Sequence, residues 1–124
     1  MSAKSHVLTD LELEIMKVVW GLQTATVRDV YEELQKRRKI AYTTVMTMMR
    51  ILEQKGHLKK SQRDRAYLYR PAKPKKEVVK KMVQEFVARV FNGSAEPLLV
   101  HLVEDSYLSE ENLKEVTRLL KEKQ

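Results

Sequence analysis

Residues 41–56, AYTTVMTMMRILEQKG, predict the helix that decides the fold. The pattern indicates a helix over about 42–55 that stops at Gly56, a residue type suited to the left-handed conformation found just after helix ends. One side is an apolar stripe at helical spacing, formed by Val45, Met48, Met49 and Leu52. The other side is short, rich in hydroxyl groups and carries one arginine: Thr43, Met46, Thr47, Arg50 and Gln54. Taken alone, the segment also fits an ordinary amphipathic core helix. The sequence on either side is needed to distinguish this possibility from a helix that binds a partner.

Two helices with strong start signals precede this segment. Thr9 and Glu12 have the spacing of a capping box and open a helix over about 10–21. Thr26, with Asp29 three residues later at N3, caps a second helix. The helix over 42–55 is therefore predicted to be the third of three.

A short hairpin is predicted directly after the third helix. Residues 58–62 and 66–70 are two short runs separated by Arg63-Asp64-Arg65, and the second run alternates aromatic and aliphatic residues. We expect a β-hairpin with a polar turn and a basic tip that contains Lys59, Lys60, Arg63 and Arg65. Three helices followed by a charged hairpin are the element order of a winged helix-turn-helix. The predicted fold class is therefore mainly α with a small β-hairpin wing.

Charge and composition favour a polyanion partner. Residues 1–73 contain 15 lysines and arginines against 8 acidic residues, whereas residues 74–124 contain 9 of each, so the net charge of +7 lies entirely in the first part. A basic surface kept for solubility is the alternative. The chain has no cysteine, no apolar run near the ~18 residues that span a bilayer, and no apolar signal segment in residues 1–6. We expect a cytoplasmic protein.

The outer face of the third helix is suited to a DNA major groove, because short hydroxyl side chains and an arginine can approach base edges. Arginine binds guanine through two hydrogen bonds, and threonine offers a hydroxyl to base or phosphate and a methyl to thymine. Thr43 and Thr44, near the helix start, alternatively bind phosphate there. Met46 is either a thymine contact or a plain surface methionine. The candidates for reading bases are Thr43, Thr44, Met46, Thr47 and Arg50.

Other basic and aromatic residues are candidates for the DNA backbone, where contacts add affinity but little sequence information. The run Lys36-Arg37-Arg38-Lys39 precedes the third helix and is either a solvated helix end or a phosphate contact. Tyr42 either stacks on sugar and phosphate or braces the turn. The backbone candidates are Lys39, Tyr42, Lys60, Arg63 and Arg65.

Pro71 and Pro74 mark a boundary between a DNA-binding domain, residues 1–73, and a helical domain, residues 74–124. Helices are predicted over 75–92, from Pro97 to about 104, and after Ser109. An arm of this size has too little bulk to fold strongly alone, so it packs either on the winged domain or, as we favour, against its copy in a dimer. The residues predicted for dimerisation are Val79, Met82, Val83, Phe86, Val87, Val90, Phe91, Leu98, Leu99, Leu102, Leu113, Val116 and Leu120.

The sequence resembles the penicillinase-repressor family, the BlaI, MecI and CopY group of regulators, from about residue 7 to its end. The most specific parts are the block that ends at Trp20 and the stretch from Thr44-Val45 to Lys55-Gly56. The resemblance implies a homodimeric repressor with a winged helix-turn-helix and a helical dimerisation arm. Such proteins bind a dyad-symmetric operator and block transcription, often of β-lactamase and sensor genes.

In β-lactam-responsive members a membrane sensor-protease leads to cleavage in the arm, so the resemblance also implies this partner system. The family's cleavage bond joins an asparagine to a phenylalanine, and the matching pair here is His101-Leu102. The copper-responsive branch uses a cysteine-rich metal site, which a chain without cysteine excludes. Thr43 and Met46 stand where staphylococcal members carry basic residues, which implies a different operator.

Three other functions compete with a repressor. An architectural winged-helix protein binds DNA without sequence preference. An enzyme is not expected, because His6, His57 and His101 lack metal-ligand spacing, and neither a glycine-rich phosphate loop nor a nucleophile motif occurs. Direct ligand sensing by the arm has little support, since aromatic content is only 6%. No metal and no cofactor are expected.

Overall fold

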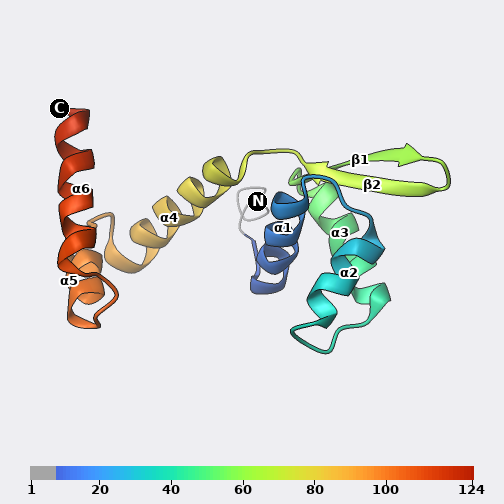
Figure 1. The fold of residues 1–124 in the computed structure, drawn as a ribbon, viewed down its shortest axis with the longest axis horizontal. Helices are drawn as coiled ribbons and strands as arrows, with labels where there is room; N and C mark the ends of the chain where they lie inside the picture. The colour runs from blue at the N-terminus through green and yellow to red at the C-terminus, as the bar shows by residue number, and fades with distance from the viewer. Residues whose placement is uncertain (1–7) are drawn as a thin grey trace. The chain divides into compact units, whose positions relative to one another are not determined.

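The computed structural model describes residues 8–124, so the apolar-poor segment 1–6 and His6 lie outside the described residues. The chain forms two compact units, residues 1–79 and 80–124. The predicted class is confirmed: the described chain is mainly helical with one two-stranded antiparallel sheet (Figure 1). The elements are α1 (Asp10–Leu22), α2 (Val27–Gln35), α3 (Tyr42–Gln54), β1 (Leu58–Arg63), β2 (Ala66–Pro71), α4 (Lys75–Phe91), α5 (Glu96–Glu104) and α6 (Glu110–Lys123).

The predicted capping box at Thr9 and the predicted cap at Thr26 are confirmed. The Thr9 hydroxyl accepts from the Glu12 amide at 3.2 Å, and the Glu12 carboxylate accepts from the Thr9 amide at 2.9 Å. The same reciprocal pair joins Thr26 and Asp29 at the start of α2. Each box satisfies amide groups that the first turn of a helix leaves without an intrahelical partner.

The core of the first unit lies where α1, α2 and α3 pack together and against the hairpin. Three of the four residues of the predicted α3 stripe, Val45, Met49 and Leu52, are fully buried, while Met48 is half-buried. Gly56 follows α3 with φ of 87°, as its predicted role requires. The largest fully buried side chains from the other elements are Ile15, Met16, Val19, Val30, Leu34 and Leu58.

A buried ion pair ties the start of α1 to the end of α3. Glu12 is 2% exposed, and the Lys55 ammonium donates to both of its carboxylate oxygens at 2.9 Å. Burial raises the pKa of Glu12, but hydrogen bonds from Lys55 and Thr9 outweigh it and hold the pKa below the usual 4.5. The ion pair between Glu12 and Lys55 therefore fixes the end of α3 against the start of α1.

The hairpin pairs β1 with β2 from Leu58 opposite Pro71 to Arg63 opposite Ala66. Ala25 extends the sheet by exchanging backbone hydrogen bonds with Tyr69 at 2.9 and 2.8 Å. The predicted basic tip was partly wrong: only Arg63 and Arg65 flank the turn, while Lys59 and Lys60 lie near the base of the hairpin. The turn itself is tight, with Asp64 at φ of 58°.

The second unit contains most of α4 together with α5 and α6. Gly93, at φ of 87°, follows α4, and Ser109 caps α6 through a reciprocal pair with Asn112. No side chain of residues 80–124 is buried, so the apolar faces of these helices are at least partly open to solvent. In the described part of the chain no helix is long and apolar enough to cross a membrane.

Candidate nucleic-acid interface

A groove of about 520 Å³ runs between the start of α2, the outer face of α3 and the hairpin. Each of the three elements contributes at least one cation to its walls: Arg28 from α2, Arg50 from α3, and Lys60 and Arg65 from the hairpin. The remaining lining residues are Thr26, Val27, Tyr42, Met46, Ala66, Tyr67 and Tyr69. A concave, cation-lined surface of this kind attracts an anionic backbone.

The predicted base-reading residues divide into two sets. Met46 and Arg50 line the groove, together with the predicted backbone residue Tyr42. Thr43, Thr44 and Thr47 are exposed but do not line it. Thr44 is turned about 100° around the helix from Thr43, so the two hydroxyls point to different sides of α3. Thr43 and Thr47, four residues apart, therefore form an exposed threonine ridge next to the groove.

The start of α3 lacks the side-chain cap that α1, α2 and α6 possess. Its N-cap residue is Ala41, which provides no side-chain hydrogen bond, and its first turn holds no acidic residue. Amide groups at an uncapped helix start are available to an anion, and the helix dipole favours negative charge there. This favours phosphate contact at the start of α3, the second of the two roles predicted for Thr43 and Thr44.

One wall of the groove contains Arg28 and Tyr42, and Tyr31 packs against Tyr42 without lining the groove. The Arg28 guanidinium lies 5.5 Å from the centre of the Tyr42 ring, and the Tyr31 and Tyr42 rings meet edge to face at 5.5 Å. These contacts hold the Tyr42 ring in place and leave it 37% exposed, and both of its predicted roles stay predictions. A held aromatic ring beside a guanidinium is suited to a sugar-phosphate strand.

The opposite wall is built on the hairpin. The Lys60 ammonium lies 4.4 Å from the centre of the Tyr67 ring and 3.4 Å from a Glu53 carboxylate oxygen. Behind it, burial raises the pKa of Tyr69, while Lys60 acts in the opposite direction. The pairing with Glu53 partly neutralises Lys60, so Arg65 and Arg50 are the groove cations from the hairpin and α3 that have no ion-pair partner among residues 8–124.

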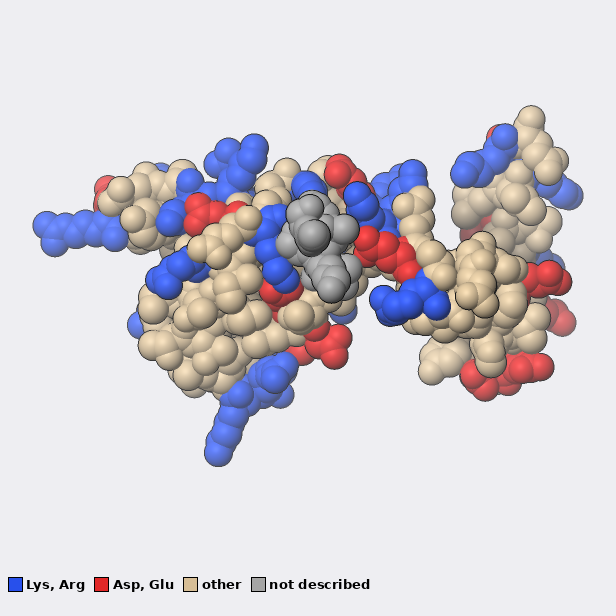
Figure 2. All heavy atoms as spheres, turned by 180° about the vertical axis from the view of Figure 1, so that it is seen from behind, with Lys and Arg blue, Asp and Glu red and all other residues tan. Residues whose placement is uncertain are grey.

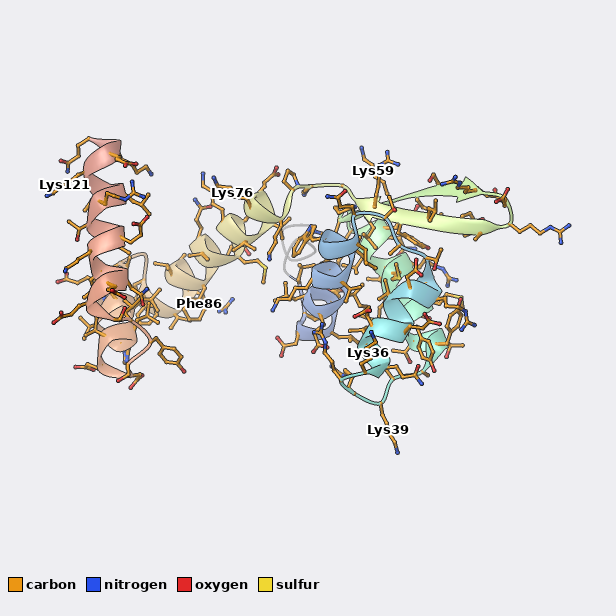
Figure 3. The ribbon with its side chains drawn as sticks, viewed as in Figure 1. Lys36, Lys39, Lys59, Lys76, Phe86 and Lys121 are labelled. Atoms are coloured by element: carbon orange, nitrogen blue, oxygen red, sulfur yellow. The ribbon has the colours of Figure 1, made fainter. Side chains whose placement is uncertain are left out.

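The basic residues before α3 differ in their contacts. Lys36 pairs with Glu33 and Arg38 with Glu14, each at 3.0 Å. Lys39 points away from the helices into solvent (Figure 3) and does not line the groove. Arg63 is exposed beside the turn of the hairpin. Lys39 and Arg63 are thus free to meet a phosphate strand, but the structure brings neither into the groove.

Sequence reasoning missed Arg28 and Tyr67 as groove residues. A usable signal existed for Arg28, since it occupies the second position of α2, where the helix dipole disfavours a cation. A cation at that place indicates a role other than helix stability. Tyr67 gave no such signal, because its position beside Lys60 depends on the register of the hairpin.

The residues predicted for dimerisation form open apolar faces in the arm. Phe86 is 40% exposed and its ring lies 5.8 Å from that of Phe91, which in turn lies 6.0 Å from His101. The exposed members of the predicted set are Val79, Val83, Phe86, Val90, Leu99, Val116 and Leu120. The half-buried members are Met82, Val87, Phe91, Leu98, Leu102 and Leu113.

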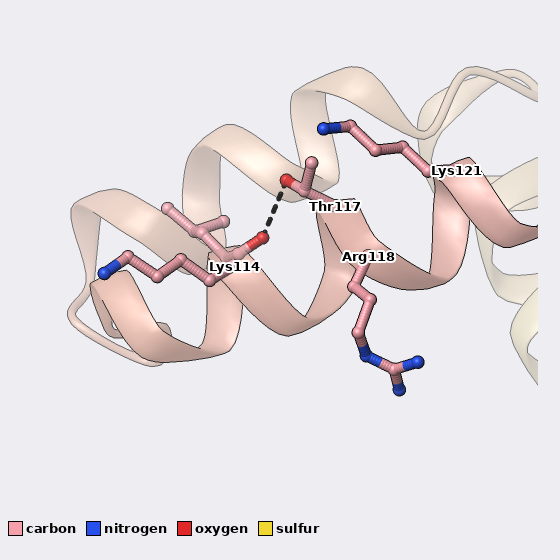
Figure 4. Close-up of a pocket in the computed structure, with 5 residues that line it drawn as sticks. Lys114, Thr117, Arg118 and Lys121 are labelled. Carbon is pink, nitrogen blue, oxygen red and sulfur yellow. Dashed lines mark hydrogen bonds between the residues drawn. The ribbon is translucent and has the colours of Figure 1, made fainter.

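A shallow hollow of about 440 Å³ follows α6 beside its apolar stripe, lined by Leu113, Lys114, Thr117, Arg118 and Lys121. The Thr117 hydroxyl donates to the Leu113 carbonyl at 2.8 Å within the helix, and Arg118 points away from Lys114 and Lys121 (Figure 4). Arg118 is held by Glu115 and Glu122 on the same helix. This is the charged flank of an amphipathic helix. Among the described residues no group of three or more acidic or histidine side chains is arranged to hold a metal.

Three packed helices, a two-stranded wing and a cation-lined groove beside the third helix define a winged helix-turn-helix protein. Residues 8–122 match the family model described as penicillinase repressor, and the chain belongs to this family. Among its relatives, the penicillinase repressor of Bacillus licheniformis is 29% identical over 93% of this chain and 90% of the relative. The transcriptional regulator BlaI of Mycobacterium tuberculosis is 38% identical over 82% of this chain and 75% of the relative.

Two solved structures are similar as well. The solution structure of the DNA-binding domain of the repressor BlaI covers 55% of this chain and 83% of its own, with 32% identity and a TM-score of 0.51. The solution structure of monomeric Bacillus licheniformis BlaI in complex with the blaP half-operator covers 57% of this chain and 87% of its own, with 31% identity and a TM-score of 0.51.

Proposed function

We propose that the protein is a sequence-specific DNA-binding transcriptional repressor that acts as a homodimer on a dyad-symmetric operator. The observation that carries the proposal is the exposed face of α3 beside a groove with cations on every wall. A related repressor of the same family has been solved on a half-operator, which supports DNA as the ligand of this surface. We expect the protein in the cytoplasm, where chromosomal DNA is accessible, and we expect no enzymatic activity.

In the proposed complex α3 enters the major groove. Arg50 is the main base-reading side chain, because it is exposed, lacks an ion-pair partner among residues 8–124 and can bind guanine bidentately. Met46 lies beside it for an apolar contact, and the threonines follow along the ridge. The DNA backbone is bound from both walls of the groove by Arg65, Lys60 and Tyr42. Arg28, which was not predicted from the sequence, joins them.

The homodimer is supported by the second unit. Residues 80–124 form three amphipathic helices without a single buried side chain, and a unit of this size does not stay ordered while its apolar faces meet water. A second copy of the arm offers matching apolar faces and a nearly balanced charge. Two linked subunits then engage two half-sites, and the second contact gains from its effective concentration.

We further propose control of β-lactamase or sensor-type genes, with induction when a membrane sensor-protease system leads to cleavage of the arm. The candidate bond, between His101 and Leu102, lies inside α5, which has no buried residue. In a subunit released from the dimer, local opening of this helix needs little free energy, so a protease can then reach its backbone. A cut there separates the halves of the arm and removes the avidity of the dimer.

The test of sequence specificity is a competition experiment. The protein is bound to fragments retained from a randomised pool, at near-physiological salt, and challenged with excess bulk DNA of random sequence. A repressor keeps its fragments against a large excess, since specific sites bind about 10³–10⁷ times more tightly than non-specific DNA. Equal displacement by both DNAs would instead favour the architectural winged-helix alternative.

Replacing Arg50 is expected to alter discrimination between DNA sequences, whereas replacing Arg65 is expected to weaken all binding. Arg50→Ala loses about 1–3 kcal/mol of discrimination at one base position. Arg65→Ala loses one phosphate contact, which lowers the slope of log K against log salt concentration by about one unit for every sequence.

The measurement is fluorescence anisotropy with the selected duplex and single-base variants of it over a salt series. The two variants control for each other, because each removes one exposed groove arginine. If Arg50→Ala weakened binding to all duplexes equally, its assigned role in base reading would be wrong.

A further inference from the structure

Cations lie on both faces of the hairpin, and only one face belongs to the groove. Residues directly opposite each other in a sheet share a face, and successive residues alternate between faces. Lys60, Tyr67 and Tyr69 are therefore on the groove face. Lys59 and its partner Arg70 are on the outer face, as is Arg63 nearer the turn.

The outer face continues into the chain that follows the hairpin. The Ala72 amide donates to the His57 carbonyl at 2.9 Å, and Val78 in the first turns of α4 is 5% exposed, so this segment is fixed to the first unit. Lys76 lies between these two anchors. In Figure 3 Lys59 and Lys76 point to the same side of the molecule.

This surface is strongly positive and unneutralised. Residues 59–76 contain eight cations, of which Lys60 and Arg65 line the groove, and one acidic residue, Asp64 in the turn. Within the described chain, Lys60 is the one cation of this segment with an ion-pair partner. Figure 2 shows lysines and arginines over much of the first unit, with acidic residues among them. Unpaired cations held at close quarters repel each other, and a polyanion relieves that repulsion.

DNA held by α3 and the wing tip does not reach this surface. Lys59 and Arg70 lie four residue pairs back from Arg63, which is about 13 Å along the strands. The minor groove is only about 7.5 Å deep, so the wing tip can enter it while the base of the hairpin stays outside. The outer cations also face away from the protein groove, beside which α3 would enter the DNA major groove.

We infer that the outer face of the hairpin, with Lys59, Arg70 and Lys76, binds the phosphate backbone of a second DNA segment, the flank of the same duplex. This inference rests on the proposed DNA binding. The flank is the occupant because it is tethered to the bound site and therefore present at a high effective concentration. Bending a site of 20–30 bp by 40–90° costs about 1–6 kcal/mol, which several phosphate contacts offset.

The test uses Lys59→Gln, Arg70→Gln and Lys76→Gln together, with two random-sequence duplexes as probes. The short duplex covers about one and a half helical turns and the long one extends it by about two turns on each side. On the long duplex the triple variant should lower the slope of log K against log salt concentration by about two to three units relative to wild type, at about 0.9 per phosphate. On the short duplex the slope should not change.

The matched control removes the same charge elsewhere, by Lys17→Gln, Lys114→Gln and Lys121→Gln, all at exposed positions. Its slopes should follow wild type on both duplexes. An equal fall on both lengths would put the outer cations on the segment that α3 binds and overturn the inference. No fall on either length would also overturn it and leave this surface to an acidic protein. Failure of wild type to bind either duplex would instead contradict the proposed function.

Discussion

Phe86→Asp is expected to convert the dimer to a monomer and to reduce operator affinity about 100- to 10,000-fold. Phe86 is an exposed aromatic residue on α4, in ring contact with Phe91, within a unit that has no buried side chain of its own. A carboxylate there cannot be desolvated in an apolar interface without a partner. The loss of affinity follows because each subunit then binds its half-site alone. Sedimentation equilibrium and a titration of operator DNA measure the two effects.

The matched control is Gln84→Asp, which puts the same charge on the same helix but about 200° around it. It should remain a dimer with wild-type affinity. Affinity of Phe86→Asp for a single half-site should equal that of wild type, which shows that the first unit is intact. A Phe86→Asp protein that stays dimeric and holds the full operator would remove this face of α4 from the interface.

Glu12→Gln is expected to lower the free energy of unfolding of the first unit by about 3 kcal/mol. Removal of one partner of a buried ion pair leaves the other charge uncompensated, at about 3–5 kcal/mol, and the 21% exposure of the Lys55 side chain puts the effect at the low end. Glutamine still accepts from the Thr9 amide, so the capping box survives and the change isolates the ion pair. Urea unfolding at neutral pH measures the difference.

The pH dependence has a definite sign. The pKa of Glu12 is lower in the folded protein than its usual 4.5, so its contribution is fully present above about pH 4.5 and is lost as the pH falls through the folded value. The gap between wild type and Glu12→Gln should therefore be constant near neutrality and close in acid. Glu14→Gln serves as control, since the side chains of its pair with Arg38 are 32% and 45% exposed and the pair contributes less than about 1 kcal/mol. A gap that did not change with pH would show that the loss is not electrostatic.

The helices of this fold were predictable because their signals are local. The capping boxes at Thr9 and Thr26 lie within four residues, and the buried stripe of α3 repeats at helical spacing. Gly56 marked the end of α3 because few other residues adopt its positive φ at low cost. Each of these features is set by neighbours along the chain.

The groove was only partly predictable, because its walls join residues that are distant in sequence. Arg50 and Met46 followed from the face of one helix, but the pairing of Lys60 with Glu53 and the stacking of Arg28 on Tyr42 depend on how three elements pack. The basic residues of the hairpin were taken as one cluster, whereas the strand register separates them onto two faces. The sequence shows how many basic residues the hairpin contains, but only the strand register shows on which face each of them lies.

The central claim, a dimeric sequence-specific repressor, is tested most directly by sequencing the DNA fragments that the wild-type protein retains from a randomised pool at near-physiological salt. We expect a dyad-symmetric motif whose half-sites lie about one helical turn, or a multiple of it, apart, since two linked α3 helices must reach major grooves on one face of the duplex. Retained fragments that share no motif, or a single half-site without symmetry, would contradict it.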